Sequence, residues 1–180
     1  MARHRKGFGI HSPFVFELLN DVFFEKNHFY SYFEIEKNSA SRSQEKTNKL
    51  LFRLANYFDC EKIMLIGENE TVKKCLSLVN SKTNIYQDKK GYNNKLKDIK
   101  QIDLFYICSD KLNYINHLNI DICHENTVIV LEDIHKNIKN KNIWKNICQA
   151  KMFDLTVDIF SFGIVFIKNN FNKQNYTVAF

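Results

Sequence analysis

DLFYIC, residues 103–108, is the first of two apolar runs that decide the fold, and TVIVL, residues 127–131, is the second. Continuous apolar runs of this length, without polar alternation, are typical of strands buried on both faces of a parallel sheet. Two weaker strand candidates precede them, at Lys62–Ile66, which stops at Gly67, and at Asn84–Gln87. We therefore expect four strands, each followed by a connecting segment.

The connecting segments carry apolar residues at helical spacing. They are Val72, Cys75, Leu76 and Val79, then Leu112, Ile115 and Leu118, then Ile143, Trp144, Ile147 and Cys148. The last part of the chain differs, because Leu155–Phe160, Gly163–Lys168 and Asn175–Phe180 are strand-like and closely spaced. Short connections indicate antiparallel strands. The whole pattern predicts an α/β fold, with a Rossmann-like doubly wound, mostly parallel sheet and antiparallel C-terminal strands.

The N-terminal third is predicted to be helical. Ser12 and Pro13 form a favoured helix start, with Ser12 as the N-cap. Ser41 and Gln44 have the spacing of a capping box at the start of a second helix. We expect one domain over residues 1–180, with a helical N-terminal extension at 1–58 and an α/β core at 60–180.

The composition excludes several classes of protein. With 44% hydrophobic and 26% charged residues, the chain is too apolar to be disordered. No apolar run approaches the roughly 18 residues of a membrane span, and the five cysteines have no zinc or haem spacing. We expect a cytoplasmic protein without membrane partners. The net charge of +6 comes mainly from dispersed lysines, so nucleic acid is not the expected partner. A homo-oligomer remains open.

Ligands of an open parallel sheet bind beyond the carboxyl ends of its strands. The segment after the first strand is Gly67–Thr71, in which Gly67 permits a tight turn. Glu68 and Glu70 place negative charge where the anionic group of a ligand would lie. Carboxylates at a helix start also stabilise the helix dipole, so this structural interpretation stands beside the functional one.

Glu132, Asp133 and His135 directly follow the TVIVL run. Asp133 and His135 are candidate catalytic residues that would act as acid and base, or they would bind a metal together with Asp110. The alternative is that Asp133 caps the next helix and His135 lies at the surface. His11, which follows two glycines, either faces a ligand or is buried or capping.

Four segments carry a resemblance to a known family. They are Gly9–Phe16 (GIHSPFVF), Leu51–Phe58 (LFRLANYF), Glu132–His135 (EDIH) and Thr156–Phe166 (TVDIFSFGIVF). In this order they resemble class I S-adenosylmethionine-dependent methyltransferases, and more narrowly a group of small bacterial methyltransferase-like proteins with an N-terminal HSPF segment. The resemblance implies a seven-stranded sheet whose last pair is antiparallel. It also implies a cofactor over the ends of the first, second and fourth strands of that family.

The resemblance also assigns candidate cofactor-binding residues. Gly67 matches the first glycine of the family's turn, and Thr71 stands where the second glycine would be. Asp88 corresponds to the acid that ends the second strand, and Asp110 keeps one acid of the turn after the fourth. His11 belongs to the matching N-terminal segment.

The departures from the family pattern predict a divergent, truncated relative. Leu65 stands where the family has an acid at the end of the first strand. The segment between Asp88 and Asp103 has room for one short helix around 92–100, but not for the family's third strand. A lost ribose contact and a side chain in the turn would cost about 1–3 kcal/mol each.

Two functions follow from these departures. S-adenosylmethionine binding is expected to be weak or lost, which favours a degenerate binding or scaffold module. The alternative is an active O-methyltransferase of an unknown small-molecule acceptor, with Asp133 or His135 as the base.

Overall fold

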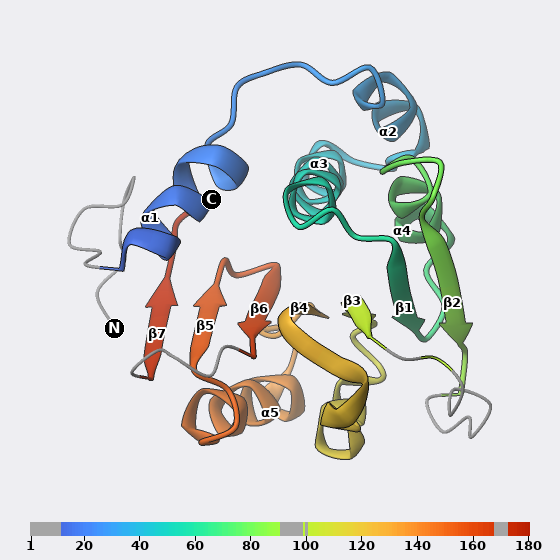
Figure 1. The fold of residues 1–180 in the computed structure, drawn as a ribbon. Coiled ribbons are helices and arrows are strands. Elements are labelled where there is room, and N and C mark those ends of the chain that lie inside the picture. Colours follow the sequence, from blue (N-terminus) through green and yellow to red (C-terminus); the bar gives the residue numbers. More distant parts are fainter. Residues whose placement is uncertain (1–11, 91–98, 100, 168–172) are drawn as a thin grey trace.

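A single mixed sheet of seven strands organises the chain, as seen in a computed structural model (Figure 1). The structure describes residues 12–90, 99, 101–167 and 173–180. The strands are β1 (Lys62–Ile66), β2 (Asn84–Asp88), β3 (Ile102–Ile107), β4 (Cys123–Glu132), β5 (Leu155–Asp158), β6 (Phe162–Phe166) and β7 (Gln174–Thr177). Their order across the sheet is β2-β1-β3-β4-β6-β5-β7.

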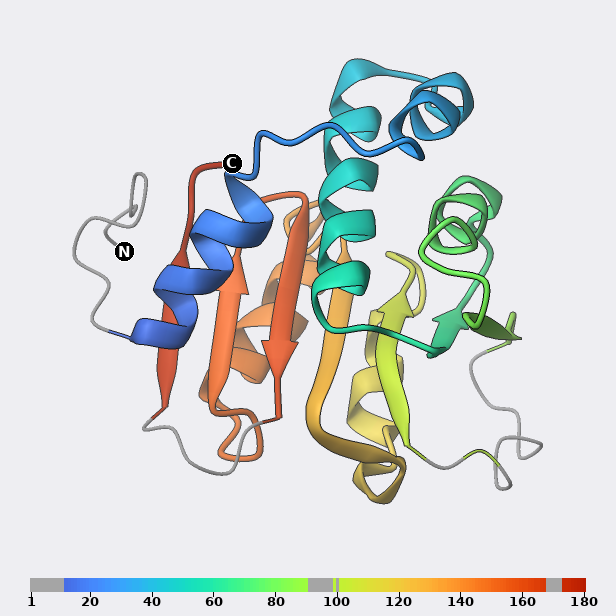
Figure 2. The ribbon, with the colours of Figure 1, turned by 45° about the horizontal axis from the view of Figure 1, so that its top comes forward.

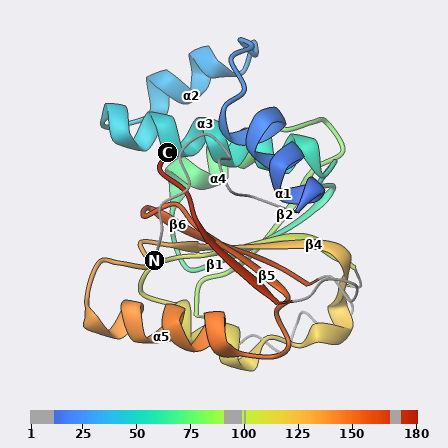
Figure 3. The ribbon, with the colours of Figure 1, turned by 90° about the vertical axis from the view of Figure 1, so that its left-hand side faces the viewer.

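Helices cover both faces of this sheet (Figures 2 and 3). The α-helices are α1 (Pro13–Leu18), α2 (Tyr32–Asn38), α3 (Arg42–Tyr57), α4 (Glu70–Leu76) and α5 (Ile138–Gln149). A π-helical turn, η1 (Leu19–Phe23), continues α1, and two 3₁₀ helices, η3 (Leu112–His117) and η4 (Ile120–Ile122), lie between β3 and β4. Figure 3 shows α1, α3 and α4 on one side of the sheet and α5 on the other.

Alternate strand residues supply two separate apolar cores. On the side of α1, α3 and α4, fully buried residues such as Leu18, Leu51 and Leu65 belong to one cluster. On the side of α5, a second cluster contains Ile66 and Trp144. Because the central strands are buried on both faces, their sequences are continuously apolar, which is the pattern that predicted them.

The strand register brings the candidate site segments to one edge of the sheet. Ile66, at the end of β1, is opposite both Asp88 of β2 and Ile107 of β3. Ile107 is in turn opposite Leu131 of β4. The carboxyl ends of four parallel strands therefore lie level, so the turns that follow them lie at the same edge of the sheet.

The expected helix starts are confirmed. The Ser12 hydroxyl accepts a hydrogen bond from the backbone N–H of Val15 at 3.4 Å, and Pro13 is the first residue of α1. The Ser41 hydroxyl accepts one from the backbone N–H of Gln44 at 3.2 Å. The fold class is also confirmed, with parallel central strands and an antiparallel β6.

One strand pairing corrects the expectation for the C-terminal strands. β5 and β6 are antiparallel, as predicted, but β7 lies beside β5 and pairs with it in parallel. Because β6 is antiparallel to β5 and β7 is parallel to it, β6 and β7 run in opposite directions although they are not neighbours in the sheet.

Two further segments bear on the sequence interpretation. The helix expected around 92–100 falls outside the described residues except for Ile99. In the part of the chain that is described, no helix combines the length and apolar character that a membrane crossing requires.

Candidate functional site

Glu132, the last residue of β4, is the centre of the polar contacts at the carboxyl edge. Its Oε1 accepts hydrogen bonds from the Asn69 side-chain amide and the Tyr106 hydroxyl, both at 2.8 Å. Its Oε2 accepts one from the backbone N–H of Ser109 at 2.9 Å. Burial first, and then the Glu132 carboxylate, raise the pKa of Tyr106 well above its ordinary value. The phenol therefore stays protonated, and Glu132 ties β3, β4 and the start of α4 together.

The turn after β1 is closed by the protein's own groups. Gly67 has a φ of 104°, and a Cβ built there would lie 2.7 Å from Cys108 Cβ and 2.9 Å from its Sγ. The Gly67 carbonyl accepts a hydrogen bond from the Gln87 side chain at 3.0 Å, and Gln87 accepts one from Lys73 at 3.1 Å. Lys111 also lies within 3.3 Å of the built Cβ. The room left by the missing side chain is therefore filled.

The start of α4 is likewise engaged within the chain. The Asn69 side chain accepts a hydrogen bond from the backbone N–H of Val72 at 3.1 Å, so it caps the helix. Glu70 occupies the first turn, as the dipole interpretation expects. Glu68 is exposed and forms an ion pair with Lys89 at 3.2 Å.

The structure brings together some of the predicted cofactor residues. Asp88 is buried beside the Gly67 turn, whose N–H donates to the Asp88 carbonyl at 2.9 Å. The Asp88 carboxylate accepts a hydrogen bond from the backbone N–H of Lys90 at 3.0 Å. Asp110 follows β3 at the same edge, where it is exposed and pairs with Lys111 at 3.4 Å.

Thr71 is not placed with that group. Thr71 lines a small gap that also includes Ile35 and Asn38 of α2, so it is not among the residues that line the crevice over β3 and β4. His11 lies outside the described residues.

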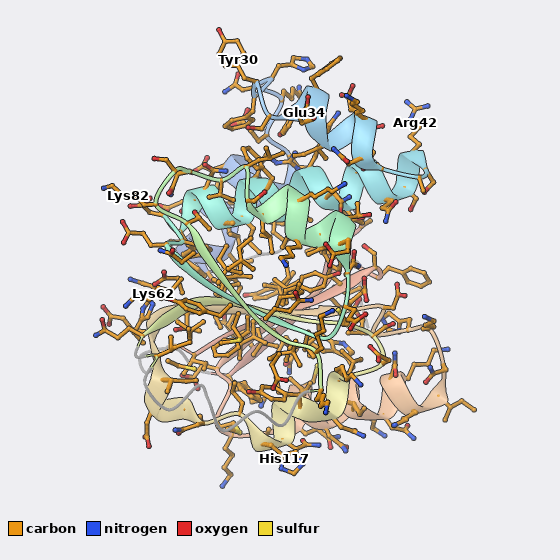
Figure 4. The ribbon with its side chains drawn as sticks, turned by 90° about the vertical axis from the view of Figure 1, so that its right-hand side faces the viewer. Tyr30, Glu34, Arg42, Lys62, Lys82 and His117 are labelled. Carbon is orange, nitrogen blue, oxygen red and sulfur yellow. The ribbon has the colours of Figure 1, made fainter. Side chains whose placement is uncertain are left out.

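A crevice of about 290 Å³ lies over the ends of β3 and β4. The first half of α3 forms one wall, with Ser43 and Asn48, and Asn69 and Glu132 form another. In Figure 4, Arg42 marks the start of α3 at the side away from Lys62, which begins β1. The helix N-terminus therefore lies over the carboxyl edge of the sheet. The crevice is polar and about as small as the smallest ligand pockets.

Asp133 follows Glu132 in the left-handed region of backbone space, with a φ of 51°. Its carboxylate forms an exposed ion pair with Lys136 at 3.7 Å. It does not cap α5, because the cap is Asn137, whose side chain accepts from the backbone N–H of Asn140 at 2.9 Å. The capping interpretation of Asp133 was wrong, since the chain makes a further turn before the helix begins.

His135 is partly buried and paired, so the expectation of a simple surface residue was also wrong. Its Nε2 lies 2.7 Å from Oδ2 of Asp158, at the end of β5. Asp133 and His135 thus have different partners, and no hydrogen bond joins them. Among the described residues, no group of three or more histidines, cysteines or acids is placed to hold a metal ion.

Sequence reasoning missed three residues of this edge. Tyr106 is fully buried, and a buried tyrosine requires a partner for its hydroxyl, which was a usable signal. Asp158 is a buried acid within an apolar strand, and such acids are almost always paired. Asn69 carried no signal beyond its position before a helix.

No family model and no curated protein matches the sequence, but solved structures do. The O-methyltransferase TomG from Streptomyces achromogenes, in complex with SAM, aligns with a TM-score of 0.53 at 9% identity, over 83% of this chain and 96% of that one. The SAH-bound methyltransferase PaMTH1 from Podospora anserina aligns with a TM-score of 0.54 at 9% identity, over 81% and 91%. The chain has the class I methyltransferase fold.

This methyltransferase fold implies an S-adenosylmethionine site over the ends of β1, β2 and β3. The residues present fit that group poorly. Cys108 and Lys111 fill the space beside Gly67. The Gly67 carbonyl already accepts a hydrogen bond from the Gln87 side chain. Leu65 is buried in the core and offers no polar atom for the ribose.

Proposed function

We propose that this chain is a binding or scaffold module of methyltransferase fold in which S-adenosylmethionine binding is weak or lost. The observation that carries the proposal is the filled turn after β1. A nucleoside site needs close approach to the backbone at such a turn. Here a Cβ at Gly67 would lie 2.7 Å from Cys108 Cβ, so the close approach that glycine permits serves the packing of the end of β1 against the end of β3.

Charge at the turn supports the same proposal. Glu68 and Glu70 flank the start of α4, where the carboxylate of the methionine moiety would benefit from positive potential. The helix-start amide of Val72 is already bonded to Asn69. A ligand would have to displace this bond, and losing one costs about 0.5–1.5 kcal/mol.

A scaffold needs a contact surface, and the segment around α2 supplies exposed aromatic side chains. Tyr30 is fully exposed, Phe33 is 69% exposed and Phe29 is 37% exposed. Figure 4 shows Tyr30 projecting away from the body of the molecule. Clustered exposed aromatic residues mark interaction sites more often than free surface. We propose that this surface supports self-association, as a homo-oligomer.

The cofactor part of the proposal is tested by thermal unfolding of the full chain with S-adenosylmethionine and S-adenosylhomocysteine at millimolar concentration. TomG measured in parallel is the positive control. We expect no shift for this chain. A ligand at a hundredfold excess over its dissociation constant stabilises by about 2.7 kcal/mol, and a shift of that size would favour the active methyltransferase instead.

The scaffold part is tested by sedimentation of the chain at low and high salt. We expect an oligomer that persists at high salt and is weakened by replacing Tyr30 and Phe33 with serine. The matched control is Ile138→Ser, because Ile138 is 76% exposed on α5, on the other face of the sheet. A monomer at all concentrations would contradict the self-association.

A further inference from the structure

A second cavity, of about 670 Å³, lies beyond the ends of β5 and β7. The residues that line it include His135, Asp158, Phe160, Val178 and Phe180. It shares no lining residue with the crevice over β3 and β4. Its size is within the range of small-molecule sites, which are mostly apolar with a few placed polar groups.

The polar group of this cavity is a fixed imidazole. Asp158 is buried, and its Oδ2 lies 2.7 Å from His135 Nε2. Its Oδ1 accepts a hydrogen bond from the backbone N–H of Phe160 at 2.8 Å. A carboxylate on one ring nitrogen fixes the tautomer and orientation of a histidine. In the neutral ring, Nδ1 is then an acceptor, and it has no hydrogen-bond partner among the described residues.

The apolar group of this cavity is Phe160. Its ring is stacked on His135, with centroids 5.2 Å apart and planes inclined by 22°. The side chain is 71% exposed, and its backbone has a φ of 73°. A bulky residue in the left-handed region is a strained outlier, and such strain concentrates at ligand sites. The bond from Phe160 N–H to Asp158 holds this strained turn in place.

Phe180, which also lines the cavity, is held in position as well. Its ring packs edge-on against Phe23 at 6.0 Å, and the Lys46 ammonium lies 4.4 Å from its centroid. Two aromatic side chains therefore contribute to the walls, together with Val178. None of the described residues that line the cavity is a lysine or an arginine, and Asp158 places a carboxylate beside it. An anionic ligand is disfavoured.

We propose that this cavity binds a neutral, flat aromatic molecule that carries one N–H or O–H donor. The ring packs on Phe160, and the donor is bonded to Nδ1 of His135. The aromatic surface selects the flat ring, and the lone acceptor nitrogen selects the donor. This site shares no lining residue with the crevice over β3 and β4 and is apart from the ends of β1, β2 and β3, where the fold implies S-adenosylmethionine, so it stands whether or not that cofactor binds.

The test is an NMR titration of the isotope-labelled full chain with indole and with 1-methylindole, which lacks the N–H donor. We expect indole to shift the resonances of residues 158–160 and 177–180. 1-Methylindole should bind about three- to tenfold more weakly, which is the effect of one hydrogen bond. Absence of shifts at these residues, or equal affinity for the two compounds, would overturn the proposal.

Variants assign the effect to the imidazole. His135→Phe keeps an aromatic ring and removes the acceptor, so the preference for indole should vanish. The matched control is His124→Phe, because His124 also pairs with a carboxylate, Asp103 at 2.9 Å, but at the amino edge of the sheet. It should leave indole binding unchanged. Phe160→Ser should weaken both ligands about three- to tenfold, through loss of stacking. Full indole preference in His135→Phe would overturn the assignment.

Discussion

Replacing Gly67 with alanine tests the packing of the turn after β1 in a quantitative way. The new methyl group would lie 2.7 Å from Cys108 Cβ, 2.9 Å from its Sγ and 3.3 Å from Lys111 Cγ. The first two contacts involve a buried strand-end residue that cannot move freely, whereas the lysine can. The substitution also places a side chain at a φ of 104°, where L-residues are strained.

The two effects add in the same direction. Left-handed backbone costs a non-glycine residue about 1–2 kcal/mol. Overpacking of a filled site costs about 1–3 kcal/mol. We therefore expect Gly67→Ala to lower the free energy of unfolding by about 3 kcal/mol. For a chain of this size, the melting temperature should fall by about 6–12 °C.

The measurement is urea unfolding of the wild type, Gly67→Ala, Cys108→Ala and the double variant. Cys108→Ala removes the Sγ contact but keeps Cβ. In the Cys108→Ala background, Gly67→Ala should therefore cost about 1 kcal/mol less than it costs in the wild type. A loss of no more than about 1–2 kcal/mol would refute the reasoning, because backbone strain alone would account for it. It would mean that the space beside Gly67 is open.

Three other perturbations have defined outcomes. Gly163→Ala places a Cβ 2.5 Å from the ring of Trp144, the single tryptophan. It should lower the free energy of unfolding by about 2 kcal/mol and change the tryptophan fluorescence, and an unchanged emission spectrum would contradict this packing. Arg53→Met leaves the carbonyl of Val22 in η1 and the hydroxyl of Tyr32 in α2 without their donor. It should cost about 3 kcal/mol and increase hydrogen exchange at η1 and α2, and exchange unchanged from wild type would exclude this role. Burial raises the pKa of the Cys75 thiol from 9.0 to about 12, so between these pH values this thiol ionises only in the unfolded state. The free energy of unfolding should therefore fall as the pH rises through this range. Cys75→Ala should reduce the fall by about 1.4 kcal/mol per pH unit, and an unchanged slope of stability against pH would contradict this prediction.

The sequence predicted what depends on local pattern. Buried strands such as Asp103–Cys108 and capped helices such as the one after Ser41 were found, because apolar periodicity and capping side chains act over a few residues. α2 (Tyr32–Asn38) was missed, because it has seven residues and Ser31 before it makes no capping hydrogen bond. The place of β7 beside β5 was missed because strand order depends on contacts between distant segments.

The site shows the same division. Glu132, Asp133 and His135 were correctly located at a strand end, because the strand itself was recognised. Their partners were not, since Asp158 and Tyr106 come from other strands. A side chain's chemistry depends on such partners, so the sequence could locate candidate residues without assigning their roles.

The central claim is that the protein's own side chains fill the corner in which adenosine would lie. Equilibrium dialysis of the full chain against radiolabelled S-adenosylhomocysteine, with TomG as the positive control, tests it most directly. The account predicts no retention of label by this chain at millimolar ligand. Saturable binding at one site per chain in the micromolar range would contradict it.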